Sequence, residues 1–167
     1  MKNNYAKIDI MIDSAEDLYS KYSIDTNPTL NPEVESFINS NIKDSKVKEK
    51  FKFNIHTPNE LSEAEQLNYA RVIKKHYNAL VQESMQMIMR YLLISVILLA
   101  VGLFFGTMLI ISKASVNPIV VILFEVLTWV FVWEFIDIIA FIIPVKQFKT
   151  KRLKKVANAK FNFVVTK

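Results

Sequence analysis

Apolar residues fill most of the second half of this chain. The first run, Tyr91–Ile111, has 21 residues, of which only Ser95 and Thr107 are polar. A helix needs about 20 apolar residues to cross the roughly 30 Å hydrocarbon core of a bilayer. A second run, Asn117–Val145, follows after a short connection. Both runs are therefore predicted to be membrane-spanning helices.

The first half of the chain shows the period-two pattern of strands. Apolar and polar residues alternate in Lys7–Asp13, and Phe51–His56 repeats the alternation. The sequence Ser14-x-x-Asp17 follows the first of these strands, and Thr57-x-x-Glu60 follows the second, as capping boxes that begin helices. We interpret this as a strand-to-helix unit used twice, although similarity over so few positions can also arise by chance.

A short helix is predicted between the two strands. Asn31-Pro32-Glu33 supplies an N-cap, a proline at the first helical position and an acid in the first turn. A stripe of apolar residues follows at Val34, Phe37, Ile38 and Ile42. The order strand, helix, strand favours parallel strands with a right-handed crossover. We expect Asn41–Lys50 to be a charged connector.

A very long helix is predicted next. No glycine or proline occurs between Pro58 and Gly102, so a helix that begins near Leu61 should continue into the first span. Its predicted stripe comprises Leu67, Ala70, Tyr77, Leu80, Val81, Ser84 and Ile88. Core packing is the preferred interpretation of this stripe, and a self-associating stalk is the alternative.

The chain after the second span is basic. We expect Pro144 to end the membrane helix and Lys146–Ala159 to form a helix in the membrane interface, with Phe148, Leu153 and Val156 on its apolar side. Its candidate lipid-headgroup ligands are Lys149, Lys151, Arg152, Lys154 and Lys155. The alternative is that they serve only as positive charge beside the membrane. Lys160–Thr166 alternates briefly and is expected to add a third strand.

The predicted fold class is an α/β membrane protein. It combines a two-helix transmembrane hairpin with a small cytoplasmic module of two or three strands and two or three helices. The expected segments are a strand-helix-strand module (1–60), a long helix continuous with the first span (61–90), the first span (91–112), an extracytoplasmic loop (113–117), the second span (118–144), and the interfacial helix with the last strand (145–167).

Charge distribution predicts the topology. Residues 1–89 carry 11 basic and 13 acidic side chains, whereas 146–167 carries eight Lys or Arg and no acid. Arg90 and this tail flank the two spans on one side, and the connecting loop has only Lys113. The positive-inside rule then places both termini in the cytoplasm. Met1–Asp13 lacks the apolar stretch of a signal peptide.

Ionisable residues inside the second run need an explanation. Glu125, Glu134 and Asp137 lie at hydrocarbon depth, where an ionised side chain costs at least about 2.5–3.5 kcal/mol. Such a residue faces a partner, an aqueous path or another copy of the chain. Arg90 can snorkel toward Asp137 or Glu134, and a structural ion pair is the preferred interpretation. Glu125 has no basic residue at its depth.

Two further features of the spans concern helix packing. Trp129 and Trp133 continue the four-residue spacing that starts at Glu125 and lie too deep for an interfacial aromatic belt. Gly102 and Gly106 are the only glycines in the chain and form a Gly-x-x-x-Gly motif, which permits close approach of two helices. They are expected to pack against the second span or against another copy, or to have no packing role.

Composition argues against several classes of function. Without cysteine the chain has no thiol nucleophile and no Cys-ligated metal. The absence of cysteine also agrees with a location in a reducing compartment. His56 and His76 lack a second ligand at metal spacing. We therefore predict no enzyme activity, no metal and no cofactor. The basic tail lacks the interleaved aromatic residues of a nucleic-acid surface, so no nucleic-acid partner is predicted.

These features together resemble an uncharacterised family of small bacterial two-span inner-membrane proteins. The resemblance is carried by Phe51–His56, the long helix into the first span, the segment Trp133-Glu134-Phe-Ile-Asp137 and the basic exit Lys146–Lys155. It implies an inner-membrane location and a cytoplasmic α/β module. A looser similarity links the chain to the two-span effectors of bacterial antiviral systems, which self-assemble to breach the membrane.

The predicted function is non-enzymatic. We expect self-association or partner binding through the cytoplasmic module, with membrane lipids and further copies of the chain as partners, and possible action as a membrane-disrupting effector. The alternatives are an ion- or small-solute-conducting subunit whose acids line a polar path, and a membrane anchor or scaffold for a cytoplasmic protein.

Overall fold

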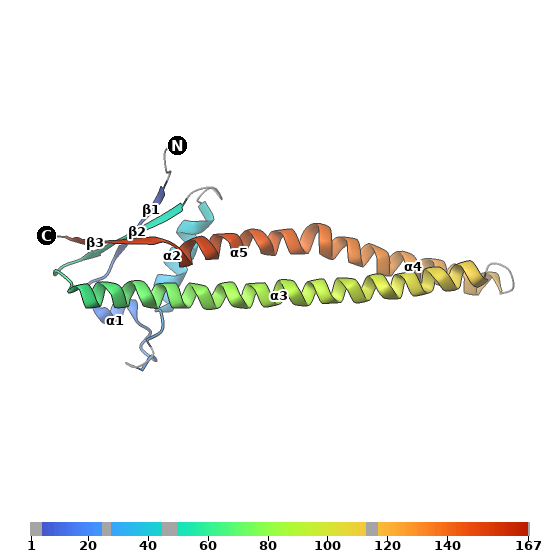
Figure 1. Cartoon of the computed structure of the whole chain (residues 1–167), viewed down its shortest axis with the longest axis horizontal. Helices are drawn as coiled ribbons and strands as arrows, with labels where there is room; N and C mark the ends of the chain where they lie inside the picture. Colours follow the sequence, from blue (N-terminus) through green and yellow to red (C-terminus); the bar gives the residue numbers. More distant parts are fainter. Residues whose placement is uncertain (1–4, 25–27, 45–49, 113–116, 167) are drawn as a thin grey trace. The chain divides into compact units, whose positions relative to one another are not determined.

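The chain divides into two compact units. The computed structural model describes residues 5–24, 28–44, 50–112 and 117–166. One unit, called here the sheet module, comprises residues 1–82 and 150–167, and the other, the helix pair, comprises residues 83–149. The long helix α3 (Glu63–Ser112) runs without interruption and contributes residues to both units (Figure 1).

Three parallel strands form the sheet of the sheet module. β1 (Tyr5–Met11), β2 (Lys50–Thr57) and β3 (Lys160–Val165) lie in the order β1-β2-β3, with β2 in the centre (Figure 1). Ile8 pairs with Phe53, and Phe53 pairs with Phe161. The parallel pairing and the third strand are both confirmed.

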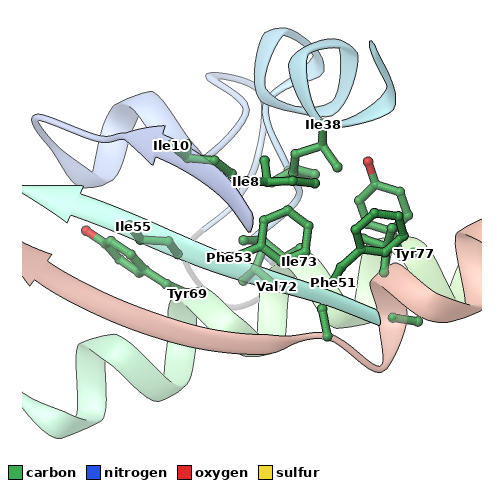
Figure 2. Close-up of a cluster of buried hydrophobic side chains, with 14 of the residues drawn as sticks. Ile8, Ile10, Ile38, Phe51, Phe53, Ile55, Tyr69, Val72, Ile73 and Tyr77 are labelled. Carbon is green, nitrogen blue, oxygen red and sulfur yellow. The ribbon is translucent and has the colours of Figure 1, made fainter. Parts of the chain in front are cut away.

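One face of this sheet is buried. Ile8, Ile10, Phe53 and Ile55 alternate with polar neighbours and point into the core, as period-two strands require. Figure 2 shows Ile38 of α2 (Pro32–Asp44) together with Val72, Ile73 and Tyr77 of α3 beside these strand residues. The buried cluster also contains Leu153 and Val156 of α5 (Ile143–Ala157). Helices from three parts of the chain therefore share one core.

Burial of Leu153 and Val156 changes the interpretation of the basic helix. The sequence analysis assigned both residues to the apolar side of an interfacial helix. They are instead buried in the core of the sheet module, while Phe148 is exposed within the helix pair. Apolar residues spaced at three and four positions form the same stripe whether protein or lipid covers them.

The predicted stripe of α3 is wrong at its start. Leu67 is exposed, and Tyr69, Val72 and Ile73 are buried in its place, whereas Tyr77 is buried as predicted. Leu80 and Val81 pack at the edge of the same core, as expected. A helix with many apolar residues offers several overlapping stripes, and the contact with the sheet selects among them.

The stripe of α2 is only partly correct. Ile38 and Ile42 are buried, Val34 packs against the core, and Phe37 is exposed. The predicted cap of α2 is confirmed, because the backbone N–H of Glu33 donates to Asn31 Oδ1 at 2.9 Å. The helix continues to Asp44 and so occupies the start of the segment expected to be a connector. Residues 45–49 of that segment lie outside the described part.

One of the two predicted capping boxes is displaced. The backbone N–H of Ser14 donates to Asp17 Oδ2 at 2.8 Å and begins the short helix α1 (Ala15–Leu18), as predicted. Thr57 instead belongs to β2, and α3 is capped by Ser62, whose N–H and hydroxyl donate to Glu65 Oε2 at 2.8 and 2.7 Å. These bonds hold the pKa of Glu65 below its ordinary value. The helix can begin only after the chain has left the sheet.

Pro144 does not end the second helix. α4 (Pro118–Asp137) continues through a π-helical turn, η1 (Ile138–Ile142), into α5. The N–H of Ile143 donates to Ile138 O, five residues back. A proline lacks the N–H of a helical residue, and its ring clashes with the carbonyl four residues earlier. The wider turn before Pro144 avoids this clash, so the helix adapts to the proline and does not stop.

Two helices are long and apolar enough to cross a membrane. They are Glu63–Ile111 and Pro118–Ala157, with mean hydropathy of 2.7 and 2.3 in their most apolar windows. Asn117 caps the second through a hydrogen bond from the N–H of Ile119 to its Oδ1 at 3.0 Å. The described part of the chain ends at Ser112 and resumes at Asn117, so four residues of the predicted loop (113–116), Lys113 among them, lie outside it.

We expect Phe161→Ala to loosen the sheet. The ring of Phe161 stacks on Phe53 with a centroid distance of 5.3 Å, and its loss should lower local stability by about 1–3 kcal/mol. Amide exchange of β2 in the full-length protein should then accelerate about tenfold. Asn162→Ala is the matched control, because Asn162 lies on the same strand and is exposed. Equal exchange in both variants would contradict the prediction.

Candidate functional site

Gly102 and Gly106 lie against the second helix. A Cβ at Gly102 would meet Val132 Cγ2 at 3.0 Å and the backbone N of Val132 at 3.4 Å. At Gly106 the nearest atom would be Thr128 Cγ2 at 3.5 Å. The later glycine of α3 thus meets the earlier residue of α4, so the two helices are antiparallel. The glycines thus serve contact within the chain.

Aromatic packing continues this contact. The ring of Phe105 stacks on Phe131 with a centroid distance of 5.8 Å and lies 6.0 Å from Phe124. The hydroxyls of Ser95 and Thr128 each donate to a carbonyl of their own helix, at 2.8 Å. The helix pair is therefore joined through shape and dispersion at these positions, and these hydroxyls are satisfied locally.

The acids of α4 lie away from this contact. Glu125 and Glu134 are exposed, and Asp137 is half-buried immediately before the π-helical turn. Trp129 and Trp133 are 65% and 64% exposed. The residues that face α3 are Phe124, Thr128, Phe131 and Val132. The structure therefore gives α4 one face that packs on α3 and another that carries acids and tryptophans.

Arg90 does not pair with these acids. Arg90 is exposed, and within the described part of the chain it forms no ion pair with Glu134 or Asp137. At this end of the helix pair the contact is filled by Ile88, Ile138 and Ile143. The preferred ion-pair interpretation is thus absent from this structure.

The basic residues of α5 separate into two groups. Lys151, Lys154 and Lys155 line a cavity of about 520 Å³ within the sheet module. Lys149 is exposed and belongs to the helix pair, and Arg152 is half-buried. Only three of the five predicted headgroup ligands are therefore brought together.

Two further lysines complete the wall of this lysine cavity. Lys50 and Lys160, the first residues of β2 and β3, line it together with Tyr5, the first residue of β1. The sequence analysis missed all three residues. Parallel strands begin at the same edge of a sheet, so the pairing of the three strands is the information that would have grouped these residues.

A second polar cluster lies on the open face of the sheet. Asp9 Oδ1 accepts a hydrogen bond from Asn54 Nδ2 at 2.7 Å and lies 3.3 Å from His56 Nε2. His56 Nδ1 lies 3.2 Å from Thr166 Oγ1. The sequence analysis considered His56 only as a metal ligand without a second ligand and did not place these groups together. The hydrogen bond from Asn54, followed by that from His56, lowers the pKa of Asp9.

The carboxylate, imidazole and hydroxyl follow the order of a proton relay, but their surroundings do not favour catalysis. The side chain of Asp9 is 61% exposed. Relay catalysis depends on a dry site with oriented donors for the developing charge. We therefore assign these residues to the stability of the open sheet face.

His76 and Tyr77 link α3 to α2. His76 Nε2 lies 3.0 Å from Glu35 Oε2, and the Tyr77 hydroxyl donates to Asn39 Oδ1 at 3.2 Å. Burial, followed by the nearby charge of Glu35, raises the pKa of Tyr77, so the phenol stays protonated. Within the described residues no group of three or more His, Asp or Glu side chains is arranged to hold a metal ion.

Comparison of the chain with known protein families, with curated proteins and with solved structures gave no match. The resemblance to small two-span inner-membrane proteins thus stays a prediction.

The two glycines should respond differently to the same change. Gly106→Ala adds a methyl group at ordinary contact distance and removes a poor helix former, so it should be neutral or stabilising by up to about 1 kcal/mol. Gly102→Ala places a methyl group 3.0 Å from Val132 Cγ2 and should be less stable than Gly106→Ala. Unfolding in mixed detergent and dodecyl sulfate micelles, followed by tryptophan fluorescence, measures the difference. The opposite order would contradict this packing.

Asn54→Ala should raise the pKa of Asp9 toward its ordinary value of 3.8. A carboxyl whose pKa is lowered by folding contributes stability above its unfolded pKa and loses that contribution as pH falls through the folded pKa. The wild-type sheet should therefore keep this contribution at pH 4 and lose it below. Carbon-13 detected titration of the Asp9 carboxyl follows the shift, and Asn162→Ala serves as the control. An identical Asp9 titration in wild type and Asn54→Ala would refute the assignment.

Proposed function

We propose that this chain is a two-span membrane protein that acts without catalysis and self-associates through the outer face of α4. That face is defined by Glu125, Trp129, Trp133, Glu134 and Asp137. The observation that carries the proposal is the exposure of carboxyl groups on a helix whose composition suits a bilayer.

Depth makes the exposure significant. Glu125 lies eight residues after Asn117, or about 12 Å along the helix, and Asp137 lies seven residues before Pro144, or about 10 Å. Both positions would fall inside a hydrocarbon core about 30 Å thick. A carboxyl group that faces lipid there is costly, so it supports a protein partner or water on that side.

A second copy is the partner that the geometry favours. The glycines are occupied by α4 of the same chain, so association through the first span would lack its close-approach motif. The outer face of α4 offers two large exposed rings beside the acids. Carboxyl groups of facing copies can share protons and hydrogen bonds once lipid is excluded.

The remaining elements of the proposal concern location and partners. Positive charge at Arg90 and 146–155 supports cytoplasmic termini in the inner membrane of a bacterium. The sheet module would then lie in the cytoplasm and could bind a protein partner. Assembly that brings acids together within the membrane would suit a membrane-disrupting effector.

A second candidate function is ion or solute conduction. Glu125 and Asp137 are separated by 12 residues, or about 18 Å along the helix axis, with Glu134 between them. A series of acids over that length could line a polar path between copies. A third candidate, an anchor or scaffold for a cytoplasmic protein, needs neither the acids nor a second copy.

Single-cysteine variants test the association directly, because the chain has no native cysteine. Val130→Cys lies on the outer face of α4 and is expected to form disulfide-linked dimers in native membranes treated with a mild oxidant. Leu103→Cys on α3 is the matched control, since Val130 and Leu103 are 56% and 59% exposed. The Leu103→Cys variant should form at least fivefold less disulfide-linked dimer than Val130→Cys.

Equal cross-linking of both variants, or none at every expression level, would overturn the proposed interface. Glu125→Gln then separates the candidates. A conduit loses flux in reconstituted vesicles while Val130→Cys still cross-links, whereas an association held by the acids weakens in the cross-linking assay itself.

A further inference from the structure

The lysine cavity has an unusual concentration of one charge. Its described wall includes Lys50, Lys151, Lys154, Lys155 and Lys160, and no aspartate or glutamate belongs to that described wall. The three lysines of α5 come from its last two turns, and the other two come from the starts of neighbouring strands. Folding therefore gathers charges that lie far apart in the sequence.

The fold itself explains only part of this gathering. Lys154 and Lys155 occupy the last turn of α5, where the helix dipole favours cations. That effect does not apply to Lys50 and Lys160, because they belong to strands. Ammonium groups around one hollow repel each other, and a bound anion converts this repulsion into attraction. The arrangement therefore has the electrostatic character of an anion site.

The cavity also has features that suit a small ligand. Its volume of about 520 Å³ lies within the usual range for ligand pockets, about 300–1,000 Å³. Tyr5 contributes an aromatic ring, and Lys160 Nζ lies 5.9 Å from the centroid of that ring. This contact holds one ammonium group at the wall. Phe51 supplies a buried apolar side chain to the same wall.

Charge number and side-chain type indicate the ligand. Lysine presents a compact charge with three donors and binds phosphate as a point charge. Even without Lys151 and Lys155, the charges of Lys50, Lys154 and Lys160 exceed what a single carboxylate or monoanion would need. We propose that the lysine cavity binds a ligand that carries two or more phosphate groups.

Two sources could supply this chemistry. One is a free solute such as inorganic pyrophosphate or a nucleoside polyphosphate. The other is a lipid headgroup with two phosphates, because Lys151 follows the apolar second run by only a few residues in sequence. The proposal is independent of self-association through α4, and the experiment uses the full chain in lipid nanodiscs.

The first measurement is calorimetric titration of inorganic pyrophosphate into the wild-type chain in phosphatidylcholine nanodiscs at about 0.15 M salt, where long-range attraction is screened. Lys154→Gln with Lys160→Gln should weaken binding at least tenfold. Lys149→Gln with Lys7→Gln is the matched control, because it removes the same charge from α5 and from a strand outside the cavity. The control should change affinity less than twofold.

Two further measurements test whether the variants are folded and whether the ligand is a solute or a lipid headgroup. Lys154→Arg with Lys160→Arg keeps the charge at both positions and should retain binding to within about threefold, so loss of binding in the glutamine variant cannot be ascribed to charge-independent damage. Nanodiscs with 10% cardiolipin are compared with nanodiscs that contain 20% phosphatidylglycerol, which has the same charge. Weaker pyrophosphate binding in cardiolipin alone identifies a lipid headgroup, and equal binding together with binding of ATP identifies a solute.

Two outcomes would overturn the proposal. One is the absence of pyrophosphate binding at 1 mM in phosphatidylcholine nanodiscs. The other is an equal loss of affinity in the cavity variant and the control variant, which would show that binding follows net charge and not this cavity.

Discussion

Parallel pairing of β2 with β3 is the constraint on which the architecture depends. A parallel connection must leave the carboxyl end of one strand and return to the amino end of its neighbour. Here that connection comprises α3, α4, η1 and α5, so both candidate spans are inserted between two adjacent strands. The sheet therefore reaches three strands only after the chain has passed through both apolar helices. Without β3, the Phe53 ring would lose its stacking partner.

The same constraint creates the lysine cavity. Because all three strands run the same way, Tyr5, Lys50 and Lys160 begin at one edge of the sheet. The last turns of α5 must approach that edge, since only Asn158 and Ala159 separate α5 from β3. Leu153 and Val156 fix this part of the helix by burial in the core. Lys154 and Lys155, which lie between these two buried residues, line the cavity.

Sequence patterns predicted the features that depend on local periodicity. Alternation at Ile8 and Ile10 is enough to define a strand, and the absence of glycine and proline between Pro58 and Gly102 is enough to define a long helix. The errors arose where tertiary contact selects among equivalent local choices. Both Thr57 and Ser62 begin an acceptable capping box, and only the end of β2 decides between them.

Pro144 and the lysine cavity show two further limits of sequence reasoning. A proline usually ends a helix, but a π-helical turn absorbs it when the residues on both sides are held by packing, as Ile138 and Ile143 are here. The cavity required the register of three strands, so no local pattern could reveal it. Side chains near one another in sequence, such as Lys149 and Lys151, can also belong to different units.

α4 has two faces, and its three acids lie away from the face that packs on α3. Packing within one chain therefore does not explain why these acids are present. Contact with α3 is made through small and apolar groups, with Gly102 close to Val132 and Phe105 stacked on Phe131. No carboxyl group takes part in that contact, so a lone helix pair gains nothing from keeping three of them. Replacing them by apolar residues would leave the contact intact and remove the cost of placing acids in lipid. The proposed self-association would give these acids and the exposed tryptophans beside them a protein surface in place of lipid.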